Sequence, residues 1–322
     1  MTGLPLPQPA DVIEAERRLR PALSRSPLWI SPALGALLGA EIWIKGEFAN
    51  PVASFKLRGA LNHLLSSADE RGACTASTGN HGQAVAYAAR MLGRTADVFL
   101  PHGCPETKKQ AIARFGGTLH VTGADLDEAK VAARIFAANR NLAFVDDGES
   151  PHVIAGAGTI GLEIARDCSD TAYVFAPAGS ACLASGVSMG LKAMGSAAKV
   201  IAVQSAQSPC MARSFNARRA IEHPVTTICD CLNQRIPPEL SLACMLEHVA
   251  EAIEVDNTEC LAAMHTLLAD AHLLMEVGAA AALAGAWRHR QVIRSSTTVL
   301  IASGANSDAA MILRALETPK IG

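Results

Sequence analysis

Charged and aromatic side chains are scarce in this 322-residue chain. Asp, Glu, Lys and Arg make up 18% of the residues, Phe, Trp and Tyr make up 4%, and the formal net charge is −2. Proteins that bind nucleic acid use a basic surface or a platform of aromatic rings, so this composition argues against a nucleic-acid partner. Half of the residues are hydrophobic, and the low charge favours a surface partly covered by a second copy, a homodimer.

Signals for a membrane, for secretion and for a metal site are also missing. The most apolar stretch, residues 277–287, lies between Glu276 and Arg288 and is shorter than the ~18 residues that a membrane span needs. The first residues lack the basic and apolar regions of a signal peptide, and we expect a cytoplasmic protein without a membrane partner. The nine cysteines include no C-x-x-C pair and no histidine at zinc-finger spacing, so we expect reduced thiols and no metal site.

Short apolar runs alternate with longer segments of helical period from about residue 42 onward, which is typical of a parallel α/β architecture. Strands are predicted at 41–44, 73–76, 96–100, 118–121, 143–145, 172–176, 200–203 and 299–302. Helices are predicted at 54–65, 82–91, 105–115, 125–139, 152–166, 183–194, 258–271 and 307–316. Residues 205–238 contain four prolines and are predicted to form loops.

Three predicted turns carry small polar residues from the end of a strand into a helix. They read STGNHG at 77–82, APAGSACL at 176–183 and SGANSD at 303–308. Parallel strands bring such turns to one edge of a sheet, where free backbone N–H groups bind anions such as phosphate. Each turn alone is equally well explained as an ordinary capped turn. No G-x-G-x-x-G is present, which removes the main support for a nicotinamide enzyme.

A fourth segment, SFKLRGA at 54–60, places Lys56 in the first turn of a predicted helix with Ser54 as its N-cap. An isolated lysine is usually a surface residue. Here the segment precedes the turn at 77–82, then GAGTIGLE at 156–163, and then the other two turns. In this order the segments resemble the fold-type II pyridoxal 5′-phosphate enzymes, and within them the serine/threonine dehydratase and serine racemase family.

The resemblance covers most of the chain and implies an α/β fold similar to that of tryptophan synthase β. This fold has two open, twisted α/β domains with pyridoxal 5′-phosphate in the cleft between them. Residues 1–65 and 147–322 are implied to form a large, discontinuous cofactor-binding domain. Residues 66–146 are implied to form a small domain that carries the asparagine turn.

The resemblance also assigns roles to single residues. Lys56 is implied to hold the cofactor covalently and to remove the Cα proton of the amino acid, and burial would free its amine by disfavouring the ammonium form. Asn80 and Ser303 are implied to contact the cofactor ring, on which Phe55 packs. The implied phosphate loop consists of Gly179, Ser180, Ala181, Cys182 and Leu183. The implied substrate-binding residues are Ser77, Thr78, Gly79, Asn80 and His81.

The implied activity is that of a lyase, which converts a small β-hydroxy amino acid of the L-threonine or L-serine type into a 2-oxo acid and ammonia. A neutral Ser303 beside the ring nitrogen suits this β-elimination better than transamination. Thr78 stands where the racemases have a proton-exchanging serine, so it is a second catalytic candidate, and racemisation or β-replacement stays an alternative. A non-catalytic ligand-binding descendant is the third hypothesis.

Several positions depart from the family pattern. Only Gly179 remains of the usual glycine run, so we expect either a phosphate loop without positive φ angles or a displaced phosphate. Gln204 stands where some members have an acidic metal ligand, and we expect no such site. Glu276 matches a family glutamate near the cofactor, although a helix cap explains it equally well. The chain ends soon after Asn306, so we expect no carboxy-terminal regulatory domain.

Overall fold

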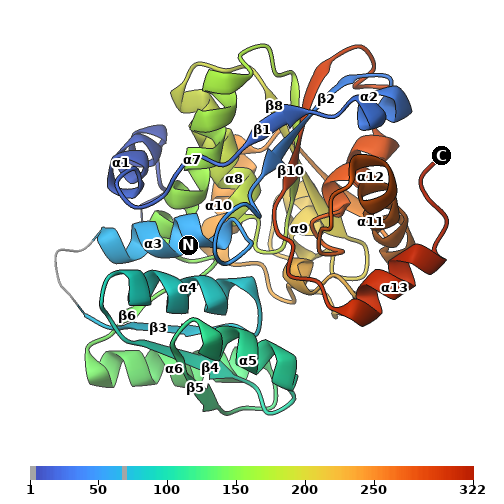
Figure 1. Cartoon of the computed structure of the whole chain (residues 1–322). Helices are drawn as coiled ribbons and strands as arrows, with labels where there is room; N and C mark the ends of the chain where they lie inside the picture. Colours follow the sequence, from blue (N-terminus) through green and yellow to red (C-terminus); the bar gives the residue numbers. More distant parts are fainter. Residues whose placement is uncertain (1–4, 67–70) are drawn as a thin grey trace.

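Two β-sheets organise the computed structural model, which describes residues 5–66 and 71–322 (Figure 1). The larger sheet has the order β1-β2-β10-β7-β8-β9, and every neighbouring pair in it is parallel except β1 and β2. Its strands are β1 (Leu28–Ile30), β2 (Glu41–Gly46), β10 (Thr297–Ala302), β7 (Tyr173–Pro177), β8 (Lys199–Ser205) and β9 (Glu251–Val255). The strand nearest the C-terminus therefore lies inside the sheet.

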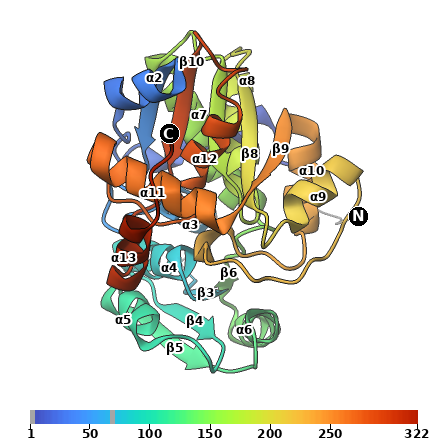
Figure 2. The same ribbon diagram turned by 90° about the vertical axis from the view of Figure 1, so that its right-hand side faces the viewer.

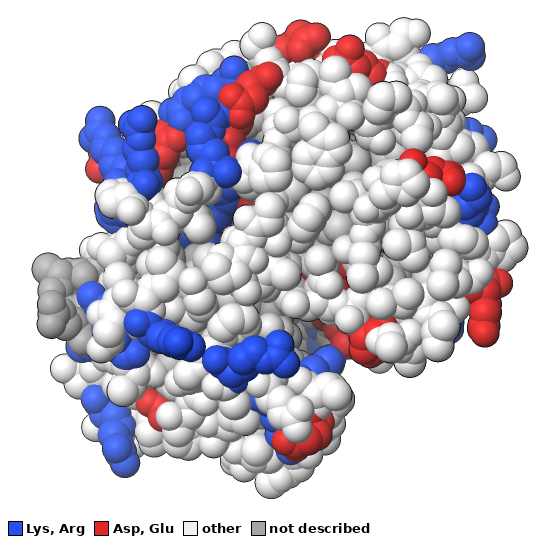
Figure 3. Space-filling view, in the orientation of Figure 1, with Lys and Arg blue, Asp and Glu red and all other residues white. Residues whose placement is uncertain are grey.

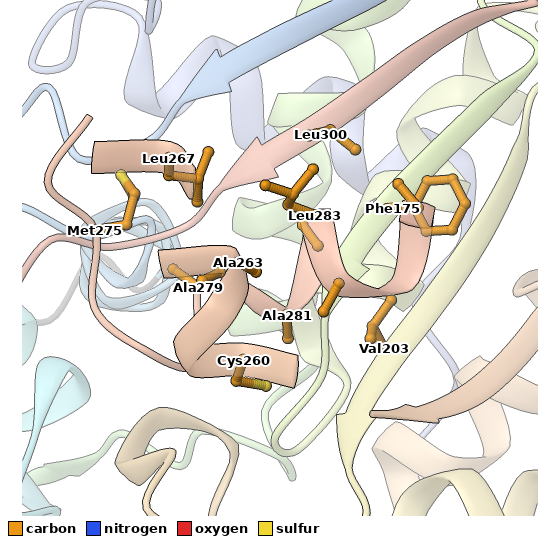
Figure 4. Close-up of a cluster of buried hydrophobic side chains, with 14 of the residues drawn as sticks. Phe175, Val203, Cys260, Ala263, Leu267, Met275, Ala279, Ala281, Leu283 and Leu300 are labelled. Atoms are coloured by element: carbon orange, nitrogen blue, oxygen red, sulfur yellow. The ribbon is translucent and has the colours of Figure 1, made fainter. Parts of the chain in front are cut away.

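Helices cover both faces of this sheet, so its central strands are buried on both sides. On one face lie α7 (Pro151–Asp167) and α8 (Cys182–Ala193), and on the other lie α11 (Asn257–Ala271) and α12 (Ala281–Arg288) (Figures 1 and 2). Six of the seven residues of β8 are buried, in the near-continuous apolar run typical of parallel strands. Figure 4 shows the core beneath α11 and α12, where Leu283 packs among side chains from several elements.

Glycines let α7 and α8 approach each other closely. A Cβ added at Gly190 of α8 would overlap the carbonyl oxygen of Gly158 on α7, and one added at Gly161 would overlap the backbone of Val187. Because only glycine permits this backbone approach, the small residues of GAGTIGLE have a packing role. Helix α1 (Pro9–Leu19) packs on the same pair.

The smaller sheet has the order β5-β4-β3-β6 and is parallel throughout. Its strands are β5 (Gly117–Val121), β4 (Ala96–Leu100), β3 (Ala73–Ala76) and β6 (Ala143–Phe144). Helices α4 (Asn80–Met91) and α5 (Glu106–Arg114) lie on one face, and α6 (Leu126–Arg140) lies on the other (Figure 1). Helix α3 (Lys56–Leu65) contacts both α4 and α7, so it joins the two halves.

Every predicted strand and helix is present, with ends within two residues of the predicted ones. Strands β1 and β9 and helices α1, α2 (Pro32–Leu38) and α10 (Glu239–His248) were not predicted, whereas the helix predicted at 307–316 is α13 (Ala309–Glu317). The loop prediction for residues 205–238 was wrong in part, because α9 (Cys210–Ala217) and a short 3-10 helix (Asp230–Leu232) lie there. Pro209 precedes α9, where a proline fits without breaking a helix. No helix in residues 5–66 and 71–322 is long and apolar enough to cross a membrane.

Candidate active site

The carboxyl ends of β3, β6 and β10 face a cleft of about 390 Å³ between the two sheets. On the side of the larger sheet, the cleft is lined by Lys56, Ser180, Cys231 and Glu276. On the side of the smaller sheet, it is lined by the turn at 77–81 and the loop at 145–148. A narrow recess continues inward past Phe55, Gly179, Cys182 and Ser303. The structure thus brings together predicted site residues from five separate segments.

Lys56 is the first residue of α3 and is only 9% exposed. The prediction of Ser54 as the N-cap was wrong, because Phe55 occupies that position. The Ser54 hydroxyl still accepts a long hydrogen bond of 3.4 Å from the Lys56 backbone N–H. The Lys56 ammonium lies 4.7 Å from the centre of the Phe55 ring, so the aromatic face is against the head of the lysine.

Asp147 is the ion-pair partner of Lys56. Lys56 Nζ donates to Oδ1 and Oδ2 of Asp147 at 2.5 and 2.7 Å. Burial by itself disfavours the ammonium, but the Asp147 carboxylate outweighs burial and raises the pKa of Lys56. The expectation that burial frees the amine is therefore wrong for this arrangement. Burial likewise opposes the Asp147 carboxylate, yet Lys56 and then His81 lower the pKa of Asp147.

The sequence analysis missed Asp147. Its one signal was position, since the pair Asp146-Asp147 directly follows a predicted strand, at the sheet edge where polar groups meet. Asp146 points the other way and accepts from Lys130 and Arg134 of α6, at 2.9 and 2.7 Å. Its other oxygen accepts the backbone N–H of Gly148 at 3.0 Å, so the loop that presents Asp147 is held at two points.

The asparagine turn lines the outer cleft through Ser77, Thr78 and Gly79. Asn80 begins α4, its Nδ2 donates to Glu276 Oε1 at 2.8 Å, and its Oδ1 accepts from Asn306 Nδ2 at 2.8 Å. Burial raises the pKa of Glu276 to about 7, although the Asn80 hydrogen bond acts in the opposite direction. The alternative interpretation of Glu276 as a helix cap was wrong. Ala280 occupies the N-cap position of α12, and no side-chain hydrogen bond is formed at this cap.

His81 lies deeper than the turn around it. It is 4% exposed, and its Nε2 lies 3.0 Å from the carbonyl oxygen of Val145. Its Nδ1 has no hydrogen-bond partner among the described residues and lies 4.0 Å from Asp147 Oδ1. Burial lowers the pKa of His81, although the Asp147 carboxylate acts in the opposite direction.

A cradle for an anion lies where β7 leads into α8. The Ser180 hydroxyl is buried there without a well-placed partner in the described chain, apart from the nearby Cys182 sulfur, which is a weak acceptor. Ala181 precedes the helix at φ +63°, so the expectation of a loop without positive φ was wrong. Gly179 lies against the loop that carries Cys231, because a Cβ added at Gly179 would be 2.6 Å from the Cys231 carbonyl oxygen. The free N–H groups of α8 up to Leu183 complete the cradle.

Ser303 directly follows β10, lies in the same recess and is 3% exposed. Its carbonyl oxygen accepts the Phe55 N–H at 3.0 Å, which ties the lysine segment to the end of the central strand. Gln204, for which no metal role was expected, accepts the Ala212 N–H at 2.9 Å through Oε1. Of the residues that the structure describes, no three His, Cys, Asp or Glu side chains are grouped as metal ligands.

The donor set fits pyridoxal phosphate. The anion cradle suits a phosphate, the buried lysine suits an aldehyde, and the amide and hydroxyl of Asn80 and Ser303 suit a polar ring. With its two parallel sheets and the cleft between them, the protein has the architecture of the fold-type II class of pyridoxal-phosphate enzymes.

Comparison with known proteins agrees with this class. The family model described as pyridoxal-phosphate dependent enzyme matches residues 19–304, and the chain belongs to this family. An L-threonine ammonia-lyase of Thermotoga maritima is 35% identical over 308 residues, which cover 94% of this chain and 77% of that protein.

Two solved structures are similar over nearly the whole chain. The processed form of threonine deaminase isoform 2 from Solanum lycopersicum has a TM-score of 0.89 and 30% identity, with 97% of this chain and 92% of that one covered. Maize serine racemase has a TM-score of 0.90 and 25% identity, with 97% of each chain covered.

Proposed function

We propose that the protein is a pyridoxal-phosphate-dependent ammonia-lyase. It converts a small β-hydroxy amino acid, of the L-threonine or L-serine type, into a 2-oxo acid and ammonia. The relatives named as threonine ammonia-lyase and threonine deaminase support this activity. The observation that carries the proposal is the buried Lys56, which faces both the asparagine turn and the anion cradle across one cleft.

Each group of the cleft has a separate task in this reaction. The bound cofactor supplies an aldehyde that holds the amino acid and a ring that withdraws electrons from Cα. Lys56 is the base that takes the Cα proton. The hydroxyls and N–H groups of Ser77, Thr78 and Gly79 hold the substrate carboxylate at the mouth of the cleft. Ser180 and the first turn of α8 hold the phosphate.

Purified holoprotein tests this function directly. Incubation with L-serine and with L-threonine should release 2-oxo acid and ammonia in equal amounts, and one of the two substrates should be preferred. Lys56→Ala should abolish both the visible absorption of the lysine-bound cofactor and the activity. A variant that kept both would refute the proposal.

A racemase is the second candidate, and the Thr78 hydroxyl in the cleft is the observation in its favour. A hydroxyl on the substrate-facing turn can exchange a proton on the face opposite Lys56. The structural similarity to maize serine racemase points the same way. Assay of D-serine beside 2-oxo acid in the same incubation separates the two activities.

We further propose that residues 66–146 form a small domain and that the rest of the chain forms the large one. We also propose that the enzyme is cytoplasmic.

A homodimer is proposed from the surface of the larger sheet. Figure 3 shows a broad area with few charged side chains over β1 and β10, where Ile30 is 46% exposed. Such an apolar face suits a subunit contact. Sedimentation analysis of the holoprotein tests the dimer, limited proteolysis tests the domains, and cell fractionation tests the location.

A further inference from the structure

We propose that Asp147 is a further catalytic residue, which passes the proton taken up by Lys56 to the leaving β-hydroxyl group of the substrate. The inference rests on the proposed elimination reaction. It gives a function to the one carboxylate, among residues 5–66 and 71–322, that lies within hydrogen-bond distance of the Lys56 amine.

The geometry places Asp147 between the base and the open cleft. Its carboxylate lies 2.5 Å from Lys56 Nζ on one side, and its side chain is 33% exposed on the cleft side. The Asp146 contacts with α6 and with the Gly148 N–H fix the loop behind it. A group held in this way can face both Lys56 and a substrate bound at the asparagine turn.

The neighbouring lysine and arginine side chains pair with other carboxylates, whereas Lys56 pairs with Asp147. Lys130 pairs with Asp146 at 2.9 Å, and Lys108 pairs with Asp230 at 2.6 Å. Arg235, beyond the rim, pairs with Asp127. Among the described residues, the other basic group beside Asp147 is His81, whose Nδ1 lies 4.0 Å from Oδ1 of Asp147 and whose pKa is lowered by burial. A proton taken up by Lys56 therefore reaches Asp147 first.

The elimination supplies and consumes this proton in equal amounts. The Cα–H bond breaks, its proton goes to Lys56, and its electron pair forms the Cα=Cβ bond. The Cβ–O bond breaks, and its electron pair leaves with the oxygen. Hydroxide is a poor leaving group, whereas water is a good one, so one proton must reach that oxygen. Lys56 passes its proton to the Asp147 carboxylate, and the carboxylic acid so formed then donates that proton to the oxygen, which departs as water and leaves Asp147 ionised again.

Leaving-group dependence separates this function from a structural one. Asp147→Asn holoenzyme should lose at least about 100-fold in kcat/KM for L-serine, the contribution typical of general acid catalysis. For β-chloro-L-alanine the loss should stay below about 5-fold, because chloride leaves without a proton. Asp127→Asn, a change of a cleft carboxylate remote from Lys56, is the matched control and should leave both values unchanged.

A second readout does not depend on turnover. In cofactor-free protein, Asp147→Asn should make Lys56 react faster with an amine-modifying reagent at neutral pH, because the ammonium loses its counter-ion. If the wild-type enzyme eliminates from neither substrate, the proposed function fails, while this lysine measurement still reports the pairing.

Equal losses for L-serine and β-chloro-L-alanine would overturn the proposal, since Asp147 would then only position Lys56. Unchanged activity with both substrates would also overturn it. If Asp147→Asn does not retain cofactor, as measured by absorption titration, Asp147→Ser provides the same ratio of kcat/KM values. Loss of cofactor by both variants would show that the carboxylate is structural.

Discussion

Arg58 donates two hydrogen bonds to Glu163, from Nη1 to Oε1 at 2.7 Å and from Nη2 to Oε2 at 2.9 Å. Both side chains are buried, and Lys45 and Glu47 complete a group of two cations and two carboxylates. Arg58 follows Lys56 by two residues on α3, and Glu163 lies on α7. The pair therefore fixes the helix that carries Lys56.

Glu163→Gln should lower the free energy of unfolding by about 3–5 kcal/mol, because it leaves two buried cations with one carboxylate. Urea denaturation of the cofactor-free protein measures the loss. Arg213→Gln breaks the more exposed pair with Glu254 and should cost less than about 1 kcal/mol. A similar cost for both variants would contradict a special role of the buried group.

Glu276 predicts a pH dependence of stability. Its pKa is raised to about 7 in the folded protein from an ordinary value of 4.5, mainly by burial. Because the folded state holds this proton more tightly, the contribution to stability is complete below about pH 4.5 and is lost as pH rises through about 7, by up to about 3 kcal/mol. Glu276→Gln should lack this loss. Denaturant titrations at pH 5 and pH 8 measure it, and equal pH slopes for the two proteins would contradict the assignment.

Ala181 predicts a stabilising substitution. Its φ of +63° lies in the left-handed region, which costs a non-glycine residue about 1 kcal/mol. Ala181→Gly should raise the free energy of unfolding by about that amount. Ala184→Gly, inside α8, should lower it by about 1 kcal/mol or more, because glycine weakens a helix interior. Thermal denaturation of both variants provides the comparison, and a destabilised Ala181→Gly would contradict the prediction.

Ser180 predicts a selective effect on cofactor affinity. Its hydroxyl is buried without a strong partner, so Ser180→Ala should leave the stability of the cofactor-free protein unchanged or slightly higher. The dissociation constant of pyridoxal phosphate should rise by about 10- to 100-fold through loss of a hydrogen bond to a charged group. Ser185 also has a buried hydroxyl without a partner, but it lies one turn further along α8. Fluorescence titration with pyridoxal phosphate measures the dissociation constants of both variants. The dissociation constant of Ser185→Ala should equal that of the wild-type protein.

The sequence could predict the fold and the meeting of three turns at one cleft because both depend on local patterns. Apolar runs and helical period located the strands and helices, and the turns at Asn80, Ser180 and Ser303 follow strands of the two sheets whose carboxyl ends face the same cleft. Strand β9 escaped prediction because its sequence, Glu-Ala-Ile-Glu-Val, is only half buried and resembles an exposed segment. Strand β1 has three residues and pairs antiparallel, outside the repeating pattern.

Asp147 could not be predicted from such patterns. Its contact with Lys56 joins residues 91 positions apart and depends on how α6 holds the neighbouring Asp146. The left-handed conformation of Ala181 likewise results from tertiary packing, which overrides the local preference of alanine. Side-chain pairing across the cleft and backbone strain are therefore the parts of the site that could not be predicted from the sequence and are seen only in the structure.

The position of β10 has a consequence for biosynthesis. Residues 297–302 lie between β2 and β7, so the larger sheet stays split until these residues have left the ribosome. The smaller sheet needs only residues 73–144 and can form while synthesis continues. The recess that Lys56 and Ser303 line together is therefore completed late, and a nascent chain arrested before β10 should emerge with a folded smaller sheet and no capacity to bind pyridoxal phosphate.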